Sequence, residues 1–338
     1  MTTTDAEQVA DPIKHAVPRR WLAAAGLLAP GLARAQAVAF PDRAIQMVVG
    51  FPPGGQADLA ARPVAGAMER VVRQPVVVQN RPGGAGSVAS AFVARAPADG
   101  HTLLMALSSI SVIPEAERLF GRIAPYEVAQ FAPIGLVNAD PTLLAVPAAS
   151  PWRTAREFLD AARARPGDIP YGSSGAYGTL HVAMEMLAAA AQVRLLHIPF
   201  QGAGPAITAL LSANIQALAS APGTLVQHVQ TGRLRVLGCW GRERAPAFPE
   251  VPTFMELGFP EVEFYIWAGL MAPAATPAPV VARLREALAA SMRDAEALRA
   301  FEAAGSPPRH LDAPDFARFL AEDSARLVGA VRRIGRVE

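Results

Sequence analysis

Residues 50–63 have the sequence GFPPGGQADLAARP and join an apolar run, which includes Ile45, Met47 and Val49, to an Ala-rich stretch. The chain thus leaves a buried strand through two prolines and two glycines and enters a helix at once. The first backbone N–H groups of a helix have no partner within the helix, so such a loop presents donors to which an anion can bind. Residues 51–55 are therefore the first candidate for a ligand site.

Short apolar runs alternate with helical stretches on both sides of this loop. We expect strands in residues 44–51, 74–80 and 101–109, a helix over 56–73, and a glycine loop with a short helix in 81–96. This alternation is typical of a parallel sheet with helices on its faces. Pro63 falls inside the first helix, where it should kink the helix or shift its start.

The same alternation restarts after a transition at residues 131–147. We expect helices over 154–165, 178–191 and 204–213, strands in 169–174, 193–200, 215–220 and 234–240, and two amphipathic helices over 277–301 and 313–331. One αβ unit that interrupts another predicts two lobes joined by two crossing strands. Ligands of such sheets bind beyond the carboxyl ends of the strands, so the strand-to-helix loops of both lobes should face one cleft.

Two further loops have the chemistry of the first. Gly172-Ser173-Ser174-Gly175 leads to Thr179, and Gln201-Gly202-Ala203-Gly204-Pro205 opens the next helix. Glycine lets the backbone approach a ligand closely, and hydroxyls can cap a helix or contact the ligand. A hydrogen bond to a charged group contributes about 1.5–3 kcal/mol, so a few such bonds would hold a small anion without any arginine.

Each of these features also has a purely structural interpretation. The loops can be tight turns, and Ser173 and Ser174 can be plain helix caps. His181, one turn into its helix, is either a packed core residue or a ligand contact. Asp58 complements a helix dipole or meets the ammonium group of an amino-acid ligand.

The first 37 residues predict an export signal. Arg19-Arg20 precedes the apolar stretch WLAAAGLLAPGLA, and ARAQA then offers small-residue cleavage sites at Ala33-x-Ala35 or Ala35-x-Ala37. An ordinary Sec signal fits best, and the arginine pair also resembles a twin-arginine signal. We therefore expect a soluble, exported and hence periplasmic protein.

Composition excludes several classes of function. Apolar residues make up 51% and charged residues 18% of the 338 residues, so the chain can bury large cores. The net charge is +2 without a basic run that contains aromatic residues, which argues against nucleic-acid binding. Cys239 is the single cysteine, which excludes an intramolecular disulfide, and we expect a buried, inert thiol. We expect neither a cofactor nor a metal.

At these loops the sequence resembles the substrate-binding proteins of the tripartite tricarboxylate transporters, the Bug or TctC family. The resemblance rests on FPDRAIQMVVGFPPGGQADLAAR, QPVVVQNRPGGAGSVASAFVARAPADGHTLL, PYEVAQFAPIGLV, YGSSGAYGTLHVAMEML, HIPFQGAGPAITALLSANIQ, FPEVPTFMELGFP and WAGLMAPAATPAPVVARL, which follow in family order. It covers nearly the whole chain after the export signal.

The resemblance implies an α/β fold of the type II periplasmic binding protein class, with a mostly parallel sheet flanked by helices in each lobe. Lobe 1 would comprise 38–138 plus 264–338 and lobe 2 139–263, with hinge strands near 138–146 and 262–270. The protein would be a monomer that closes on a small carboxylate without reacting with it. It would deliver the ligand to membrane transporter subunits, or present it to a sensor receptor. The implied ligand contacts are Phe51, Gly54, Gly55, Asp58, Ser108, Ser109, Ser173, Ser174, Gly175, Thr179, His181, Gln201 and Gly202.

Several positions depart from the family pattern. Ile113-Pro114 replaces Asn-Pro, Gln216 and Ala219-Ser220 stand where carboxylates are common, and Trp240 replaces a small hydroxylated residue. Fewer carboxylates and an added indole on one wall suggest a less polar, aromatic acid as ligand.

An enzyme is the main alternative. Gly84-x-Gly86-x-x-Ala89 follows a strand and partly matches a dinucleotide fingerprint. However, the next strand ends in Leu107-Ser108-Ser109, without the acidic residue that would hold a ribose hydroxyl. Gly172-Ser173-Ser174-Gly175 also lacks the G-x-S-x-G pattern of a hydrolase. We therefore expect a binding protein rather than an enzyme.

Overall fold

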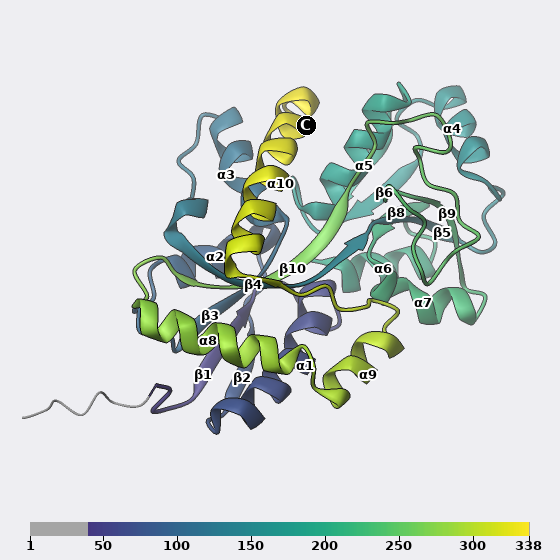
Figure 1. Cartoon of the computed structure of the whole chain (residues 1–338). Coiled ribbons are helices and arrows are strands. Elements are labelled where there is room, and N and C mark those ends of the chain that lie inside the picture. Colours follow the sequence, from purple (N-terminus) through teal and green to yellow (C-terminus); the bar gives the residue numbers. More distant parts are fainter. Residues whose placement is uncertain (1–39, 338) are drawn as a thin grey trace, which may run out of the picture. The chain divides into compact units, whose positions relative to one another are not determined.

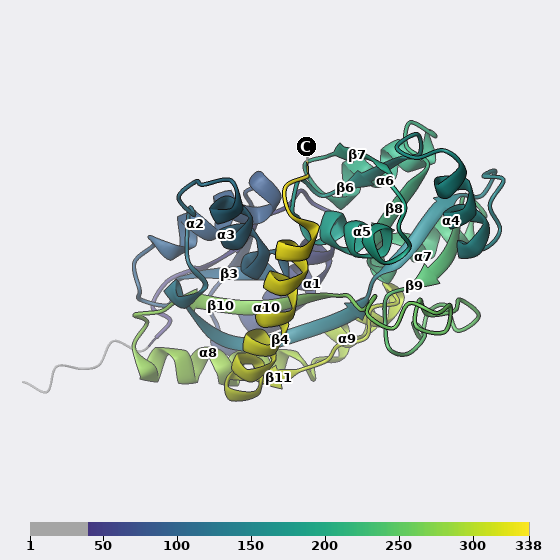
Figure 2. The ribbon, with the colours of Figure 1, turned by 90° about the horizontal axis from the view of Figure 1, so that it is seen from above.

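Two β-sheets organise the described part of the chain (Figures 1 and 2). The computed structural model describes residues 40–337, so the predicted export signal lies outside the described residues. We call the part built on the six-stranded sheet lobe 1 (40–141 and 265–337). The part built on the five-stranded sheet, together with the crossing at Thr142, is lobe 2 (142–264).

The lobe 1 sheet has the strand order β11-β4-β10-β3-β1-β2. Its strands are β1 (Ile45–Val49), β2 (Val76–Asn80), β3 (Thr102–Leu107), β4 (Phe131–Pro141), β10 (Tyr265–Pro273) and β11 (Leu311–Asp312). The lobe 2 sheet has the order β7-β6-β8-β5-β9. Its strands are β5 (Leu143–Pro147), β6 (Pro170–Ser173), β7 (Leu196–Pro199), β8 (Ala217–Ser220) and β9 (Leu234–Cys239).

The α/β fold with two crossing strands is confirmed, but the sheets are mixed rather than mostly parallel. In lobe 1, β1 runs parallel to β2 and β3, whereas β10 runs antiparallel to β3 and β4. In lobe 2, β6 runs parallel to β7 and β8, whereas β5 runs antiparallel to β8 and β9. Every antiparallel pair contains β4, β5 or β10, the strands on either side of the two crossings between the sheets.

The two crossing segments are joined by a closed set of main-chain hydrogen bonds. Trp240 N donates to Thr142 O at 2.8 Å, Thr142 N to Phe264 O at 3.1 Å, and Phe264 N to Trp240 O at 2.9 Å. The chain therefore changes sheets at Thr142 and again between Cys239 and Tyr265. The boundaries predicted for separate domains stay a prediction.

Ten α-helices lie within the described residues. They are α1 (Gln56–Val72), α2 (Ser87–Ala94), α3 (Ser109–Leu119), α4 (Ala155–Ala164), α5 (Thr179–Ala190), α6 (Ala203–Leu211), α7 (Pro222–Gln230), α8 (Ala278–Ser291), α9 (Ala295–Ala303) and α10 (Ala313–Ile334). Short 3-10 helices span Gly84–Gly86 and Val128–Gln130. Among these described helices, we find no segment that combines the length and the apolar character needed to cross a bilayer.

The helices differ from the sequence prediction at four places. The helices α3 and α7 were not expected, and α1 begins at Gln56 and continues through Pro63, so its start is not shifted. The expected helix over 277–301 is two helices, because Asp294 ends the first run and caps the second. Its side chain accepts hydrogen bonds from Glu296 N and Ala297 N, both at 3.0 Å.

The last helix links the two lobes. In both ribbon views α10 lies between α3 and α5, and it contacts each of them (Figures 1 and 2). Beyond α10, Tyr177 Oη donates to Gly335 O at 2.7 Å and accepts from Val337 N at 2.8 Å. Residues 335–337 are therefore hydrogen-bonded to the loop that precedes α5.

The lone cysteine occupies the place expected from the sequence. Cys239 is buried at the end of β9 and is not in a disulfide. Burial raises the pKa of its thiol, which keeps it protonated and unreactive.

Candidate functional site

A small cavity lies where the strand-to-helix loops of the two lobes meet. Its volume is about 20 Å³. It is lined by Phe51, Gly55, Gln56, Leu107, Ser174, Thr179, Leu180, Ala203, Ser220, Ala221 and Ile266. Apart from Ile266 on β10, these residues lie at the ends of β1, β3 and β8 and in the loops and first turns that lead into α1, α5, α6 and α7. Both lobes therefore contribute to one site at the carboxyl ends of their strands, as the αβ alternation predicts.

The opening loop of lobe 1 is held in shape by Asp58. Gly54 N donates to Asp58 Oδ2 at 3.0 Å, Asn80 Nδ2 donates to Asp58 Oδ1 at 2.9 Å, and Arg62 donates to both oxygens at 2.8 and 2.9 Å. Burial alone would raise the pKa of Asp58, but these donors outweigh it and hold the pKa below its usual value. Both oxygens are engaged within lobe 1, so Asp58 shapes the loop, and the structure gives no support to a contact with a ligand ammonium.

Glycines allow the loops of the two lobes to touch. Gly175 has φ +112°, and a Cβ on it would lie 3.4 Å from Ala85 Cβ across the cleft. Gly202 has φ +145°, and a Cβ there would come within 2.6 Å of Pro52 Cδ. Larger side chains would strain the backbone at both positions and push the lobes apart.

The glycines at 83–86 pack loops together as well. A Cβ on Gly50 would come within 2.8 Å of Gly86 Cα, and one on Gly86 within 3.2 Å of the Phe51 ring. Close packing against β1 therefore accounts for the partial dinucleotide fingerprint at Gly84-x-Gly86-x-x-Ala89.

Two predicted serines carry buried hydroxyls without a partner. Ser174 and Ser108 are 3% and 0% exposed, and neither Oγ has a hydrogen-bond partner among residues 40–337. Ser174 lines the cavity, and Ser108 directly follows the lining residue Leu107. A buried unpaired hydroxyl is costly, so a site with two of them is suited to a polar ligand.

The other predicted side chains lie beside the cavity rather than on its wall. Ser109 Oγ donates to Ala85 O at 3.0 Å, and Ser173 Oγ is 2.6 Å from His197 Nε2. Gln201 is exposed just before the start of α6. Gly54, with φ +79°, forms the turn before Gly55. Ser109, Ser173 and Gly54 thus support the loops that line the cavity, whereas the side chain of Gln201 faces solvent.

His181 belongs to an aromatic cluster inside lobe 2. Its Nδ1 accepts from Tyr177 N at 2.9 Å, and its ring lies 4.0 Å from that of His197 and 6.3 Å from that of Tyr171. Burial, with a contribution from His197, lowers the pKa of His181 to about 3, so the ring is neutral at physiological pH. These contacts fit the packed-core interpretation, but His181 Nε2 is buried without a partner among residues 40–337, so the ligand contact stays a prediction.

Trp240 is also absent from the cavity wall. Its indole is fully buried at the crossing and packs edge-on against Phe254, with ring centroids 4.5 Å apart. The prediction that the indole of Trp240 forms part of the cavity wall is therefore wrong. The structure gives no support to an aromatic acid as ligand on the basis of Trp240.

Of the lining residues, sequence reasoning found Phe51, Gly55, Ser174 and Thr179 and missed the others, which are Gln56, Leu107, Leu180, Ala203, Ser220, Ala221 and Ile266. Ser220 and Ala221 stand at the start of α7, which was not predicted. The available signal was Pro222, since proline favours the first position of a helix. Gln56 lies inside the first motif, but nothing in the local sequence shows where its side chain points.

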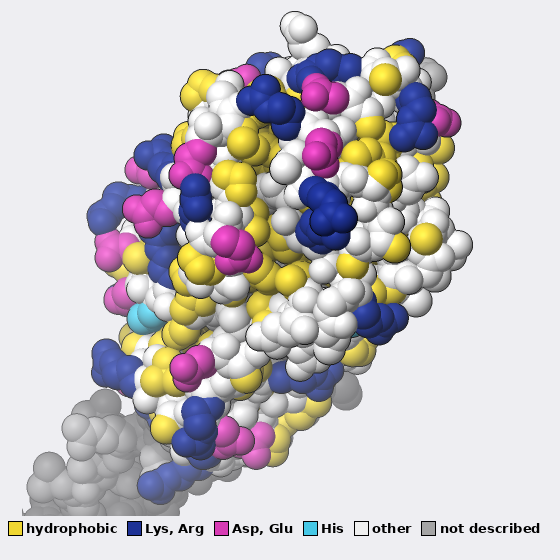
Figure 3. Space-filling model, turned by 90° about the vertical axis from the view of Figure 1, so that its right-hand side faces the viewer, with side chains coloured by type: hydrophobic (Ala, Val, Ile, Leu, Met, Phe, Trp, Pro, Cys, Tyr) yellow, Lys and Arg dark blue, Asp and Glu magenta, His cyan; other side chains and the backbone are white. Residues whose placement is uncertain are grey.

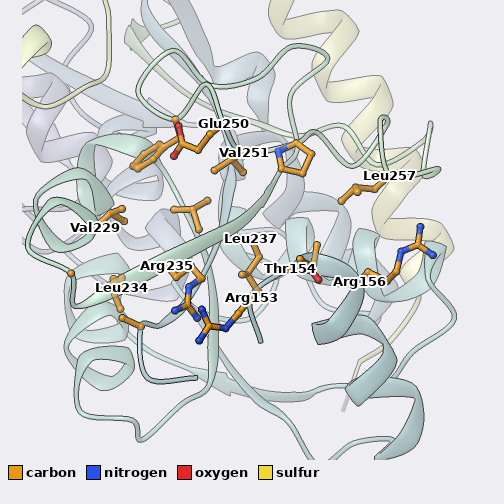
Figure 4. Close-up of a pocket in the computed structure, with 16 residues that line it drawn as sticks. Arg153, Thr154, Arg156, Val229, Leu234, Arg235, Leu237, Glu250, Val251 and Leu257 are labelled. Carbon is orange, nitrogen blue, oxygen red and sulfur yellow. The ribbon is translucent and has the colours of Figure 1, made fainter. Parts of the chain in front are cut away.

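A larger concavity of about 800 Å³ on lobe 2 has a different character (Figure 4). The start of α4, β9 and the segment 248–257 line it, and none of the glycine loops contributes. Arg153 and Arg156 are exposed, whereas Arg235 donates to Trp152 O at 2.9 Å. No buried polar side-chain atom lacks a partner among its lining residues, so the cavity between the lobes remains the candidate site.

Charge is distributed evenly on the side of lobe 2. Figure 3 shows arginines interspersed with Asp and Glu on this face. Such a surface creates no large field of one sign. Among residues 40–337, no group of three or more His, Cys, Asp and Glu side chains is arranged to hold a metal ion.

Comparison with known sequences identifies relatives over most of the chain. A family model described as "Tripartite tricarboxylate transporter family receptor" matches residues 60–335. The UPF0065 protein of the tcbD-tcbE intergenic region of Pseudomonas sp. strain P51 is 40% identical over 248 residues, 73% of each chain. BugT of Bordetella pertussis is 31% identical over 323 residues, 93% of this chain and 95% of that protein.

Solved structures show the same fold. The periplasmic binding protein BugD superposes with a TM-score of 0.82 at 27% identity, over 88% of this chain and 99% of that chain. The Rpa4515 protein of R. palustris, solved with adipate, gives 0.82 at 27% identity, over 88% and 98%. MatC of Rhodopseudomonas palustris, solved with malate, gives 0.79 at 27% identity, over 86% and 100%.

The family model covers both lobes from residue 60 onward, and BugT aligns with 93% of this chain. Proteins of this family are periplasmic solute-binding proteins and not enzymes, which removes the dinucleotide-dependent alternative. The chain therefore belongs to the Bug or TctC family, the substrate-binding receptors of the tripartite tricarboxylate transporters.

Proposed function

We propose that this protein captures a small organic carboxylate between its lobes, holds it mainly through backbone N–H groups at helix N-termini, and delivers it unchanged to a membrane transporter. The single observation that carries the proposal is the convergence of four helix starts on one cavity. The starts of α1 and of α5, α6 and α7 come from opposite lobes. Helix N-termini carry partial positive charge and unpaired donors, which suit a carboxylate; α7 contributes mainly the charge, because Pro222 has no N–H.

Related proteins support the chemical class of the ligand. Structural neighbours with the same fold were solved with adipate and with malate, which are both dicarboxylates. The family description names its members receptors of the tripartite tricarboxylate transporter family, which supports delivery to a membrane transporter.

Ligand entry requires the lobes to separate. A cavity of about 20 Å³ holds about one water molecule and no organic acid. The main-chain contacts between Thr142, Trp240 and Phe264 are the natural pivot, because both crossing segments meet there. The structure thus corresponds to an arrangement more tightly closed than the one that would hold the acid, and an open arrangement would expose the helix starts to solvent.

Gly55→Val tests the site directly. Gly55 lines the cavity with an ordinary φ of −82°, so valine is tolerated by the backbone and places its methyl groups at the anion site. Calorimetric titration of the chain from residue 38 with adipate, malate, citrate and benzoate should give binding of at least one acid. Gly55→Val should weaken that binding tenfold or more.

Gly66→Val is the matched control, since Gly66 lies in the same helix but is exposed. It should leave affinity unchanged. Cells that carry Gly55→Val should also take up less of the identified acid. If the Gly55 and Gly66 variants bind the acid equally well, the ligand does not bind beside Gly55. If no acid binds to the wild type, the proposed function is overturned.

A further inference from the structure

A buried polar cluster stands directly behind the cavity. Asp140, on β4 next to the crossing, is 3% exposed. Its Oδ2 accepts hydrogen bonds from Gln56 Nε2 at 2.6 Å, from Asn138 Nδ2 at 3.1 Å and from Ser306 Oγ. Asn138 Nδ2 also donates to Ser306 Oγ at 2.7 Å. Two elements of lobe 1, α1 and β4, and the segment after α9 thus meet at one carboxylate.

This cluster decides which way the Gln56 amide faces. When Asp140 is ionised its carboxylate only accepts hydrogen bonds, so the amide nitrogen of Gln56 must then face it. The amide oxygen of Gln56 then has no hydrogen-bond partner in this cluster. Gln56 Oε1 is buried, has no partner among residues 40–337, and lies 3.5 Å from where a Cβ on Gly223 in α7 would be. Because Gln56 lines the cavity, this oxygen is a hydrogen-bond acceptor that a ligand can satisfy.

Ser220, a second residue of the cavity wall, can also only accept a hydrogen bond from a ligand. Thr224 Oγ1 donates its only hydrogen to Ala221 O at 2.8 Å. The contact of 2.8 Å between Ser220 Oγ and Thr224 Oγ1 must therefore be donated by Ser220. Because the hydroxyl hydrogen of Ser220 is used in the bond to Thr224, Ser220 Oγ can act toward the cavity only as a hydrogen-bond acceptor.

The start of α7 adds few donors to this end of the cavity. Pro222 has no N–H, and Thr224 N already donates to Ala221 O at 3.1 Å. The wall formed by Gln56 and Ser220 therefore accepts hydrogen bonds, whereas the glycine loops donate them. One cavity thus combines a donor-rich end with an acceptor-rich end.

We propose that Gln56 and Ser220 form an acceptor subsite that selects carboxylates carrying a hydrogen-bond donor, a hydroxyl or an ammonium group, on the carbon chain. Asp140 acts as a positioning residue that holds the Gln56 amide oxygen toward the ligand. The inference rests on the proposed function and narrows its substrate class. A ligand with a methylene at this point leaves Gln56 Oε1 buried and unpaired, and such mismatches reduce binding strongly.

Three dicarboxylates with the same carbon skeleton test the subsite. Succinate has no donor on its chain, malate has a hydroxyl, and aspartate has an ammonium group. Titrations at pH 8 should show that malate or aspartate binds at least tenfold more tightly than succinate. Whichever of the two binds more tightly identifies the donor as hydroxyl or ammonium.

Variants separate a specific role from a structural one. Gln56→Met keeps the length of the side chain but removes the acceptor, so the preference over succinate should fall to about onefold while succinate affinity stays within threefold. Asp140→Asn allows the Gln56 amide to turn over and should reduce the same ratio. Gln227→Met, an exposed glutamine on α7, is the matched control and should keep the wild-type ratio.

The outcomes distinguish the inference from the function on which it rests. If the wild-type protein binds succinate as tightly as malate and aspartate, or if Gln56→Met keeps the preference, the acceptor subsite is refuted and carboxylate binding stands. If none of these acids binds and adipate, citrate and benzoate fail as well, both proposals fail together; if only one of the latter three binds, the acceptor subsite is refuted and carboxylate binding stands.

Discussion

At the scale of single residues, Asp140 makes stability depend on pH. Burial raises its pKa to about 7, compared with about 3.9 for an exposed aspartate. The native state therefore binds this proton more tightly than the unfolded chain does. The resulting stabilisation is complete below about pH 4 and is lost as the pH rises through about 7.

Asp140→Asn should remove this dependence, because asparagine stays neutral. The free energy of unfolding of the wild type, measured relative to the variant with urea, should fall by at most about 4 kcal/mol between pH 4 and pH 8. Parallel curves for the two proteins over this range would show that Asp140 titrates normally. The direction is opposite to that for Asp58, whose pKa is lowered.

The residues found from sequence and those missed differ in a physical way. Gly55, Ser174 and Thr179 were found because a glycine-rich turn before a helix fixes the local backbone whatever surrounds it. Gln56 was missed because its orientation depends on Asp140 and Ser306, which lie 84 and 250 residues away in the chain. Contacts over such separations leave no local pattern.

At the scale of elements, α1 contains an internal strain that can be measured. Pro63 lies in the eighth position of the helix, where it lacks an N–H for Leu59 O and its ring crowds that carbonyl. Pro63→Ala should therefore raise the free energy of unfolding by about 1–3 kcal/mol. Pro205→Ala in the first turn of α6 is the control, because no N–H is needed there. Urea unfolding in which both variants behave alike would contradict this explanation.

The errors in predicted elements also have physical causes. The break between α8 and α9 was missed because alanines and leucines continue the helical pattern on both sides of Asp294. The cap is visible only in the hydrogen bonds that its side chain accepts. Most other elements of the αβ alternation were predicted, since apolar periodicity carries that information locally.

At the scale of the whole molecule, ligand binding should change the overall dimensions. A ligand that contacts both lobes favours the closed arrangement by the difference between its affinities for the closed and open forms. Small-angle scattering should therefore give a smaller radius of gyration when the identified acid is added. Gly55→Val at the same ligand concentration should show no compaction, and identical curves for liganded and free wild type would contradict closure.

The attachment of the chain end to Tyr177 has a practical consequence. Gly335 and Val337 are bound to the loop that leads into α5, although they follow a helix of lobe 1. Cys239 is the single cysteine and is buried, so a thiol introduced at Val337 could be labelled selectively with a fluorescent dye. The dye would then lie at the contact between the two lobes. If ligand binding changes this contact, the fluorescence of the dye would report on it, and the protein would serve as an optical sensor for its ligand.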